Sequence, residues 1–326
     1  ERMTERLLLE AGSSVHRLLK ETDARFPKTF AGFFNARHRG EGHRLPGYNY
    51  AIISSQLDAD RLDYILRDGM ATGVKIGVYD FERIAAMFRT YTGTTSAGTT
   101  SVRLAVSYRA REAVEGYLMA RFHMFKQVYL HKAVRSAEKM LEAVLRRAAE
   151  LCGDDYEFGS PLDPALLSLL NGKRLSSKQF VELDDANIWV ALKHWVHDPD
   201  PVLSSLSQGL LDRSLYKTIL LDPNDPVIIA RTVDRARVVA AEKGYNPDYA
   251  VLLDRAADTP YTPYDPRDER SAAHIPIIEP DGTATPIEDI SDIVHLLGRD
   301  RYKITHLCVP SDVREEVQRY LAVTAV

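Results

Sequence analysis

The chain has 326 residues, of which 45% are hydrophobic and 27% are charged, and its formal net charge is −4. This length is comfortable for two domains, and the composition is that of an ordinary globular protein. The negative charge argues against a generally basic surface that coats nucleic acid, although a local basic pocket remains compatible with it.

Cysteine content and the lack of long apolar runs narrow the class further. Cys152 and Cys308 are too few and too far apart to predict a disulfide framework or a zinc site, so we expect a cytoplasmic protein. No run of about 18 apolar residues is present and no signal peptide opens the chain, so we expect no membrane association. The sequence begins at Glu1 in helical periodicity and without an initiator methionine, and we expect that its natural beginning is missing.

The first third of the sequence predicts mostly helices. Apolar periodicity and capping residues place them at 1–11, 14–22, 27–37, 56–68 and 80–91. The glycine-rich, basic stretch 37–44 is expected to be a mobile surface loop rather than a pair of histidine ligands. Residues 92–101 predict a loop or hairpin tip, and the alternation in 102–108 predicts a strand.

The helix at 56–68 carries an unusual concentration of charge. Asp58 is a plausible N-cap, and Asp60, Tyr64 and Asp68 fall within about 80° of one another on a helical wheel. A separate apolar stripe on the same helix is available for packing. A solvated surface helix could carry the same residues, so the spacing by itself does not establish a site.

A long helical run follows at 110–151, either as two helices in sequence or as one spine of about 60 Å. Arg121, Phe125, Tyr129 and Lys132 share one of its faces. Such a face is more often packed, with long charged side chains at its rim, than a binding site.

The last part of the sequence predicts three more helices and then a change to mixed structure. The helices are expected at 164–171, 184–197 and 200–211. His197 and Asp198 precede Pro199, and we interpret them as a helix end rather than as metal ligands. Strands are expected at 217–221, 249–253, 275–279, 283–287 and 303–309, with helices at 226–243, 288–297 and 311–320.

This order, with a hairpin turn at 280–282, is that of a split βαβ or ferredoxin-like unit. We therefore predict a mainly α protein in two domains. A helical domain would span 1–214, and a smaller α+β, ferredoxin-like accessory domain would span 215–326.

Two blocks of sequence resemble a known family. The stretch 54–68, followed by Thr72-Gly73-Val74, is similar to the last metal-ligand helix of HD-superfamily dNTP triphosphohydrolases, and the stretch 119–132 is similar to a second block of them. The bacterial, dGTPase-like members are the nearest likeness, and the vertebrate sterile-alpha-motif HD enzyme is more distant. Residues 183–185 and the C-terminal half resemble the family more loosely. The resemblance implies an HD-type helical bundle whose C-terminal part is residues 1–214.

The resemblance also implies roles for single residues. Asp60 would be the last carboxylate ligand of a divalent metal (Mg, Mn, Fe, Ni or Zn) and the catalytic residue of this segment. Arg61 and Arg121 would hold the triphosphate, since guanidinium forks match phosphate oxygens. Residues at the sugar would be Tyr64, Asp68 and Tyr129, the last excluding a ribose 2′-hydroxyl.

The sequence departs from the family at its start. The family's first histidine and its His-Asp pair lie upstream of the matched segment, and His16, His38 and His43 do not stand in the pattern to replace them. We expect either a fragment or a second polypeptide that supplies the missing H…HD segment.

Some members of the family are tetramers activated by nucleotides that bind between subunits, and the resemblance implies a dimer or tetramer here. Arg83, Arg109, His131 and Lys132 resemble positions that bind the activator, whereas Gln127 and Ala113 do not match that pattern. A homo-oligomer with an activating nucleotide is therefore one expectation.

Three functions remain open. The first is a metal-dependent triphosphohydrolase that converts a dNTP to deoxynucleoside and triphosphate. The alternatives are an HD phosphohydrolase acting on another nucleotide, or a catalytically inactive nucleotide-binding regulatory subunit.

Overall fold

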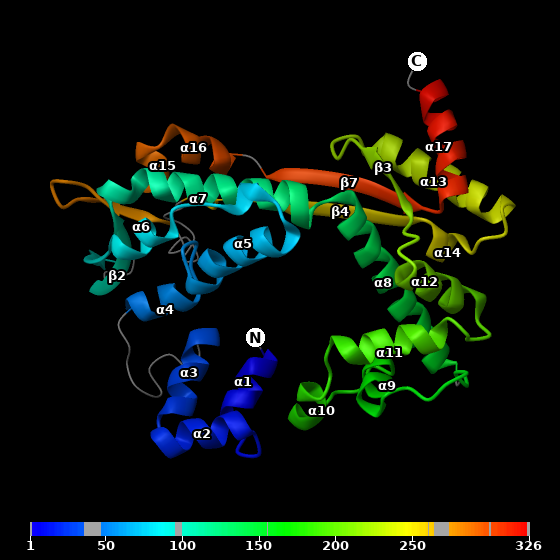
Figure 1. Cartoon of the computed structure of the whole chain (residues 1–326), viewed down its shortest axis with the longest axis horizontal. Coiled ribbons are helices and arrows are strands. Elements are labelled where there is room, and N and C mark those ends of the chain that lie inside the picture. Colours follow the sequence, from blue (N-terminus) through cyan, green and yellow to red (C-terminus); the bar gives the residue numbers. More distant parts are fainter. Residues whose placement is uncertain are drawn as a thin grey trace. The chain divides into compact units, whose positions relative to one another are not determined.

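The computed structural model describes residues 2–35, 47–94, 100–154, 156–259, 261–263, 274–299 and 301–324. The chain forms two compact units, which are shown in Figure 1. The first unit comprises Glu1–Val128 and Asp258–Tyr302, and the second comprises Tyr129–Ala257 and Lys303–Val326. Each unit is therefore built from two stretches that are distant in sequence. The basic loop predicted at 37–44 lies outside the described residues.

The predicted boundary after residue 214 does not coincide with a division between these units. It falls within the second unit, where helix α8 (Lys132–Gly153) packs against both helix α12 (Pro201–Leu211) and strand β3 (Lys217–Leu221). The helical and the mixed segments on either side of residue 214 thus share one packed body.

The first unit contains helices and one sheet. Its helices are Arg2–Leu9 (α1), Ser14–Thr22 (α2), Phe26–Phe34 (α3), Gly47–Ile53 (α4), Ala59–Thr72 (α5), Phe81–Ala86 (α6), Arg111–Met124 (α7), Ile287–Ile290 (α15) and Asp292–Arg299 (α16). Its strands are Phe88–Thr94 (β1), Thr100–Ser107 (β2), Pro276–Ile278 (β5) and Ala284–Pro286 (β6). Short 3-10 turns lie at Lys75–Gly77 (η2) and Tyr108–Ala110 (η3).

The sheet of the first unit has the order β1-β2-β5-β6. Strands β1 and β2 are antiparallel, and β5 joins β2 in parallel with Val106 opposite Ile277. The predicted hairpin is confirmed, since β5 and β6 pair around Gly282, whose φ is +87°. The hairpin belongs to this sheet and not to the C-terminal strands, however, because β2 offers it an edge and buries both Val106 and Ile277.

Two predicted helix limits in this unit are wrong. The helix expected at 80–91 ends at Ala86, because the residues from Phe88 onward pair with β2. Helix α5 does not end before Gly69 but continues to Thr72, where Gly73 closes it with φ +72°. Gly69 lies instead where α5 meets η2, and a Cβ there would stand 3.4 Å from the Cα of Gly77.

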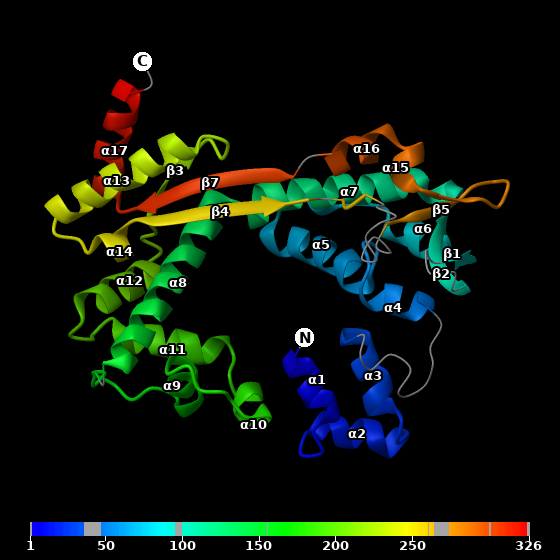
Figure 2. The same cartoon turned by 180° about the vertical axis from the view of Figure 1, so that it is seen from behind.

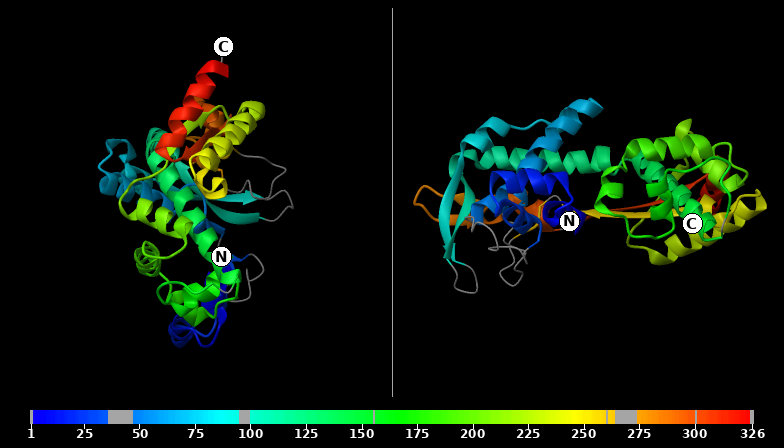
Figure 3. Two further views of the ribbon diagram at one scale, coloured as in Figure 1. Left: turned by 90° about the vertical axis from the view of Figure 1, so that its right-hand side faces the viewer. Right: turned by 90° about the horizontal axis from the view of Figure 1, so that it is seen from below.

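The second unit contains the remaining elements. Its helices are α8, Pro164–Leu170 (α9), Ser177–Val181 (α10), Asp185–Trp195 (α11), α12, Pro226–Glu242 (α13), Pro247–Ala250 (α14) and Ser311–Thr324 (α17). Its strands are β3, Leu252–Asp258 (β4) and Tyr302–Val309 (β7). One core gathers side chains of α8, α11 and α12 around Trp195, and a second lies among β3, β7, α13 and α17. Helices α13 and α17 pack together, as Figure 3 shows.

The sheet of the second unit has the order β3-β7-β4, with β3 and β7 antiparallel and Ile219 opposite Leu307. Strands β3 and β4 are connected through α13, and β7 lies between them, which is the arrangement of a split βαβ unit. The finer ferredoxin-like prediction is not confirmed, because the hairpin strands pair in the other sheet. A mainly α protein with a small α+β part is confirmed.

The long helical run is two helices. Helix α7 ends at Met124, a π-helical turn spans Phe125–Tyr129 (η4), and α8 begins at Lys132 with His131 as its N-cap. The predicted helix end at His197 is also confirmed. Asp198 is buried and accepts hydrogen bonds from the Tyr156 hydroxyl at 2.6 Å and from a backbone N–H, which is a structural role.

Candidate functional site

The candidate site is built on helices α5 and α7 of the first unit, which pack against each other (Figures 1 and 2). Asp58 is the N-cap of α5 and is 5% exposed. Its carboxylate accepts hydrogen bonds from the backbone N–H of Arg61 at 2.8 Å and from that of Ser55 at 3.1 Å. The start of α5 is therefore fixed, and with it the direction of the first turn, which carries Asp60 and Arg61.

Asp60 is exposed on this first turn. Within the described part of the chain its carboxylate has no hydrogen-bond or ion-pair partner. The positive end of the helix dipole favours a carboxylate at this position, so the residue also has a purely structural explanation.

The predicted metal site is not complete in these residues. Nowhere in the described ranges do three or more His, Cys, Asp or Glu side chains gather in a way that could hold a metal ion. One exposed carboxylate does not bind a divalent cation tightly in water. Asp60 could therefore act as a metal ligand only with donors from outside the described residues.

Arg61 is held close to the N-cap of its own helix. Its Nη1 donates to the carbonyl oxygen of Ser55 at 2.7 Å, and its Nε lies 3.6 Å from the carboxylate of Asp58. The side chain is 36% exposed. The guanidinium is thus anchored on one side and open to solvent on the other.

Arg121 lies on α7 and is only 7% exposed. Its Nε is buried without a hydrogen-bond partner, and its guanidinium carbon stands 5.4 Å from the ring centroid of Phe125. No hydrogen bond or ion pair to this guanidinium exists within the described residues. An arginine this deeply buried is ordinarily paired, because desolvating a charge is costly.

Tyr117 lies within electrostatic range of Arg61 and Arg121, although the sequence did not single it out. It is fully buried on α7, and its hydroxyl donates to the carbonyl oxygen of Gln56 at 2.9 Å. Burial raises the pKa of Tyr117, the positive charges of Arg121 and Arg61 oppose that rise, and Tyr64 adds to it. Arg61, Tyr64 and Arg121 therefore all act electrostatically on one buried tyrosine. The sequence signal that could have identified Tyr117 is its position one helical turn before Arg121 on α7.

Gln56 is a second residue that the sequence did not indicate as important. Its side-chain amide donates to the carbonyl oxygen of Thr262 at 2.8 Å and accepts from the Thr262 N–H at 2.9 Å. It is 3% exposed. This pair of bonds connects the residues before α5 to a segment 206 positions further along the chain, which no local pattern could reveal.

The other predicted site residues have mixed outcomes. Tyr64 and Asp68 are half-buried on α5. Tyr129 is half-buried in the π-helical turn and belongs to the second unit, so its predicted place at the sugar stays a prediction. Asp63, which is not among the predicted site residues, forms an exposed ion pair with Arg67.

The predicted activator residues divide between the two units. The Nε and Nη2 atoms of Arg83 donate to the carbonyl oxygen of Arg109 at 3.0 and 2.6 Å, so these two residues are adjacent. His131 and Lys132 start helix α8 in the second unit, where the His131 Nδ1 accepts from the Ala133 N–H. The activator site stays a prediction.

Comparison with known proteins gives a consistent fold and little detail of function. No protein-family model matches the chain. The protein YwfO of Bacillus subtilis, described as uncharacterized, is 28% identical over 302 residues, which are 92% of this chain and 65% of YwfO. The chain thus spans less than two thirds of that relative.

Two solved structures share the fold. A phosphohydrolase from Bacteroides thetaiotaomicron superposes with a TM-score of 0.70 at 28% identity, covering 94% of this chain and 75% of that protein. A hypothetical protein from Aquifex aeolicus superposes with a TM-score of 0.65 at 20% identity, covering 98% of this chain and 71% of that protein. No helix among the described residues is long and apolar enough to span a bilayer. The chain therefore has the fold of a protein that is named a phosphohydrolase.

Proposed function

We propose that this chain carries the substrate-binding part of a phosphohydrolase whose substrate is a deoxynucleoside triphosphate. The general activity is supported by 28% identity to the Bacteroides phosphohydrolase over 94% of the chain. The choice of dNTP rests on the similarity of residues 54–68 and 119–132 to dNTP triphosphohydrolases.

The observation that carries the proposal is the unpaired guanidinium of Arg121. It is 7% exposed, and its Nε has no partner among the described residues. Leaving a buried charge unpaired is costly, and an anionic ligand would remove most of that cost. A phosphate group is suited to this role, because its oxygens match the fork of an arginine. Arg61, whose charge acts on the same buried Tyr117, would bind a neighbouring phosphate.

The remaining residues would select the sugar. Tyr64 and Asp68 follow Arg61 on α5 at the spacing of successive helical turns, and Asp68 could accept a hydrogen bond from a 3′-hydroxyl. Tyr129 would exclude a 2′-hydroxyl. A divalent cation would supply an activated water in such an enzyme, with Asp60 as one ligand and the others from outside the described residues.

A binding role without hydrolysis is the second candidate. It is favoured by the kinds of residue present, since Arg61, Arg121 and Tyr64 suit binding of phosphate and sugar, whereas Asp60 is the single proposed catalytic group. Activation by a second nucleotide and assembly into dimers or tetramers are further parts of the proposal that rest on resemblance alone.

The test is an assay of the protein encoded by the whole gene against the four dNTPs and four rNTPs, with each candidate metal and with identification of products. We expect deoxynucleoside and inorganic triphosphate as products. The 326-residue chain by itself is expected to bind dNTP without turning it over. Release of monophosphate and pyrophosphate, or a preference for rNTPs, would contradict the proposed substrate and reaction.

Asp60 and Asp63 form a matched pair for that assay, because both are exposed on α5 and three positions apart. In the whole protein, Asp60→Asn should abolish turnover and lower the bound metal, whereas Asp63→Asn should leave both unchanged. Equal metal content in wild type and Asp60→Asn would refute the assignment of Asp60.

Variants at Arg121 test substrate binding separately from catalysis. In the 326-residue chain, Arg121→Met should weaken dNTP binding by about tenfold to a hundredfold, the effect expected for losing a hydrogen-bonded charge pair. Arg121→Lys keeps the charge but loses the fork and should give an intermediate loss. Unchanged dNTP affinity in Arg121→Met would remove the observation on which the function rests.

A further inference from the structure

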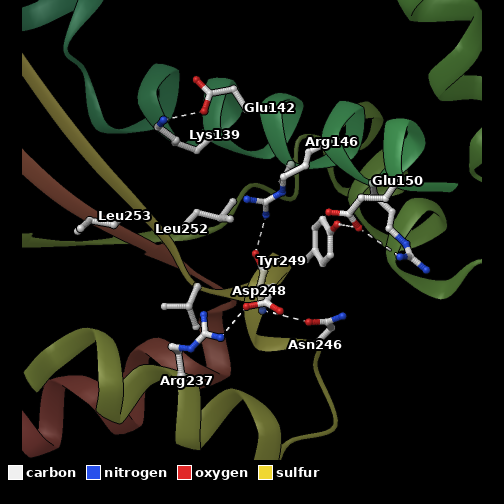
Figure 4. A pocket seen from close by; sticks show the side chains of 13 residues that line it. Lys139, Glu142, Arg146, Glu150, Arg237, Asn246, Asp248, Tyr249, Leu252 and Leu253 are labelled. Carbon is white, nitrogen blue, oxygen red and sulfur yellow. Dashed lines mark hydrogen bonds and ion pairs between the residues drawn. The ribbon is translucent and has the colours of Figure 1, made fainter. Parts of the chain in front are cut away.

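A separate cavity lies wholly within the second unit, between α8, α13 and the segment that contains α14. It has a volume of about 560 Å³ and is shown in Figure 4. Four basic side chains line it, together with three carboxylates and the ring of Tyr249. The basic residues are Lys139, Arg146, Arg147 and Arg237.

Two of these cations are committed to carboxylates within the fold. Arg147 donates from Nε to both carboxylate oxygens of Asp200 at 3.2 Å, and its Nη2 reaches the same group. The Asp200 side chain is 7% exposed, so this pair is structural. Lys139 pairs with Glu142 at 2.7 Å along its own helix.

The other two cations converge from opposite sides on one residue, as Figure 4 shows. The Nη2 of Arg146 donates to the backbone carbonyl of Asp248 at 2.7 Å, and the guanidinium lies 4.7 Å from the ring centroid of Tyr249. The Nη2 of Arg237 donates to the carboxylate of Asp248 at 2.6 Å. Arginine has five N–H donors, and these bonds use one of them in each residue.

The contact between Arg237 and Asp248 is easily exchanged. The two side chains are 44% and 66% exposed, and ion pairs in such surroundings contribute little to stability. An anion with more charge than a carboxylate could therefore replace Asp248 as the partner of Arg237. The Tyr249 ring, 5% exposed, meanwhile holds the Arg146 guanidinium in place.

We propose that this cavity binds a small molecule carrying two or more linked phosphate groups, held between the guanidinium groups of Arg146 and Arg237. Two forks that approach one point from different helices match adjoining phosphates, whereas a single phosphate would engage mainly one of them. The volume lies in the range of small-molecule sites and exceeds what one phosphate ion needs. This site does not depend on the proposed function, because none of its residues belongs to α5 or α7.

The experiment measures binding of inorganic triphosphate, ATP and inorganic phosphate to the 326-residue chain by isothermal titration calorimetry. The Arg121→Met background weakens the first proposed site, and the part of the remaining binding that Arg146→Ala or Arg237→Ala then lowers reports on this cavity. We expect triphosphate to bind and phosphate to bind at least tenfold more weakly. Tighter binding of ATP than of triphosphate would identify a nucleotide as the source of the phosphates, and the reverse would identify the free polyanion.

Three variants test the residues. Arg146→Ala and Arg237→Ala should each weaken triphosphate binding by about tenfold, the usual effect of losing one charge-assisted contact. Arg231→Ala, an exposed arginine of α13 that does not line the cavity, is the matched control and should change nothing. Asp248→Asn removes the competing charge and should strengthen binding severalfold.

The proposal is overturned if the Arg121→Met chain binds neither triphosphate nor ATP at millimolar concentration. It is also overturned if Arg231→Ala weakens binding as much as Arg237→Ala does, since that indicates a diffuse charge effect. Weaker binding in Asp248→Asn would overturn it as well, because the ligand would then not replace Asp248 as the partner of Arg237. Thermal melting of each variant verifies that it is folded.

Discussion

Arg121 in the first unit is buried and Arg135 in the second is mostly buried, yet their surroundings are opposite. Arg121 is 7% exposed and has no hydrogen-bond partner among the described residues. The Arg135 side chain is 17% exposed and binds both carboxylate oxygens of Asp254, which is 1% exposed. Both arginines follow helical periodicity and look alike in sequence, yet the fold supplies a partner to only one. An unpaired buried charge indicates a ligand, whereas a paired one indicates architecture.

The sharpest way to test this comparison is to remove each arginine in turn. Arg135→Ala leaves Asp254 buried without a counter-charge and should lower the free energy of unfolding by about 3 kcal/mol, the low end of the range for a broken buried pair. We choose the low end because Arg135 is partly exposed. Urea denaturation of the 326-residue chain measures the change.

Arg121→Met is the counterpart of that variant. It removes a guanidinium whose burial is not compensated and keeps a side chain of similar length, so the free energy of unfolding should change by less than about 1 kcal/mol or rise. If Arg121→Met destabilised the chain as much as Arg135→Ala, Arg121 would be a structural residue and the contrast between the two units would disappear.

The next largest effect is expected at Tyr129. In the whole protein, Tyr129→Ala should reduce the ratio of kcat/KM for dNTP over rNTP by roughly tenfold to a hundredfold, because an unpartnered 2′-hydroxyl costs about 1–3 kcal/mol. Tyr129→Phe keeps the ring and should keep most of the ratio. Equal loss on both substrates, together with a lower melting temperature, would indicate that Tyr129 only supports the π-helical turn.

A smaller effect concerns acid stability in the second unit. Burial lowers the pKa of His306, and the positive charges of Arg135, His131 and Lys132 lower it further. The negative charge of Asp254 raises it but does not cancel the decrease. The unfolded chain therefore takes up a proton near pH 6.5 that the folded chain resists. Stability should be insensitive to this group above pH 6.5 and should fall as the pH drops from there towards the lower, folded pKa.

His306→Phe should reduce the slope of the free energy of unfolding against pH by at most one proton, which is about 1.4 kcal/mol per pH unit. Denaturation midpoints between pH 7 and pH 5 measure the slope. His295→Asn, at an exposed position of α16, is the control. An unchanged slope in His306→Phe would assign the acid sensitivity to other groups.

The smallest effect is expected for the exposed pair of Asp63 and Arg67, whose side chains are 62% and 64% exposed. Asp63→Ala should lower the free energy of unfolding by no more than about 1 kcal/mol, because solvent screens such pairs. Salt should reduce the difference further. If Asp63→Ala lowered the free energy of unfolding as much as Arg135→Ala does, the exposure of an ion pair would not indicate how much it stabilises this protein.

The sequence by itself determined most of the helices and the place of their ends. Asp58 caps α5 as its position indicated, because an N-cap depends on a few neighbouring residues. Strand β3 and the turn at Gly282 were also predicted from local sequence, the strand from its apolar residues and the turn from a glycine that adopts a positive φ. The concentration of charge on α5 was equally visible in the sequence.

Only the tertiary structure decided which distant segments share a unit and which charges have partners. The pairing of Val106 with Ile277 and the bonds from Gln56 to Thr262 each join residues more than 160 positions apart. Burial depends on everything that packs around a side chain, so helical periodicity could not distinguish Arg121 from Arg135. The cavity at Arg146 and Arg237 was absent from the sequence-based predictions for the same reason: its two walls come from different helices and meet only in the folded unit.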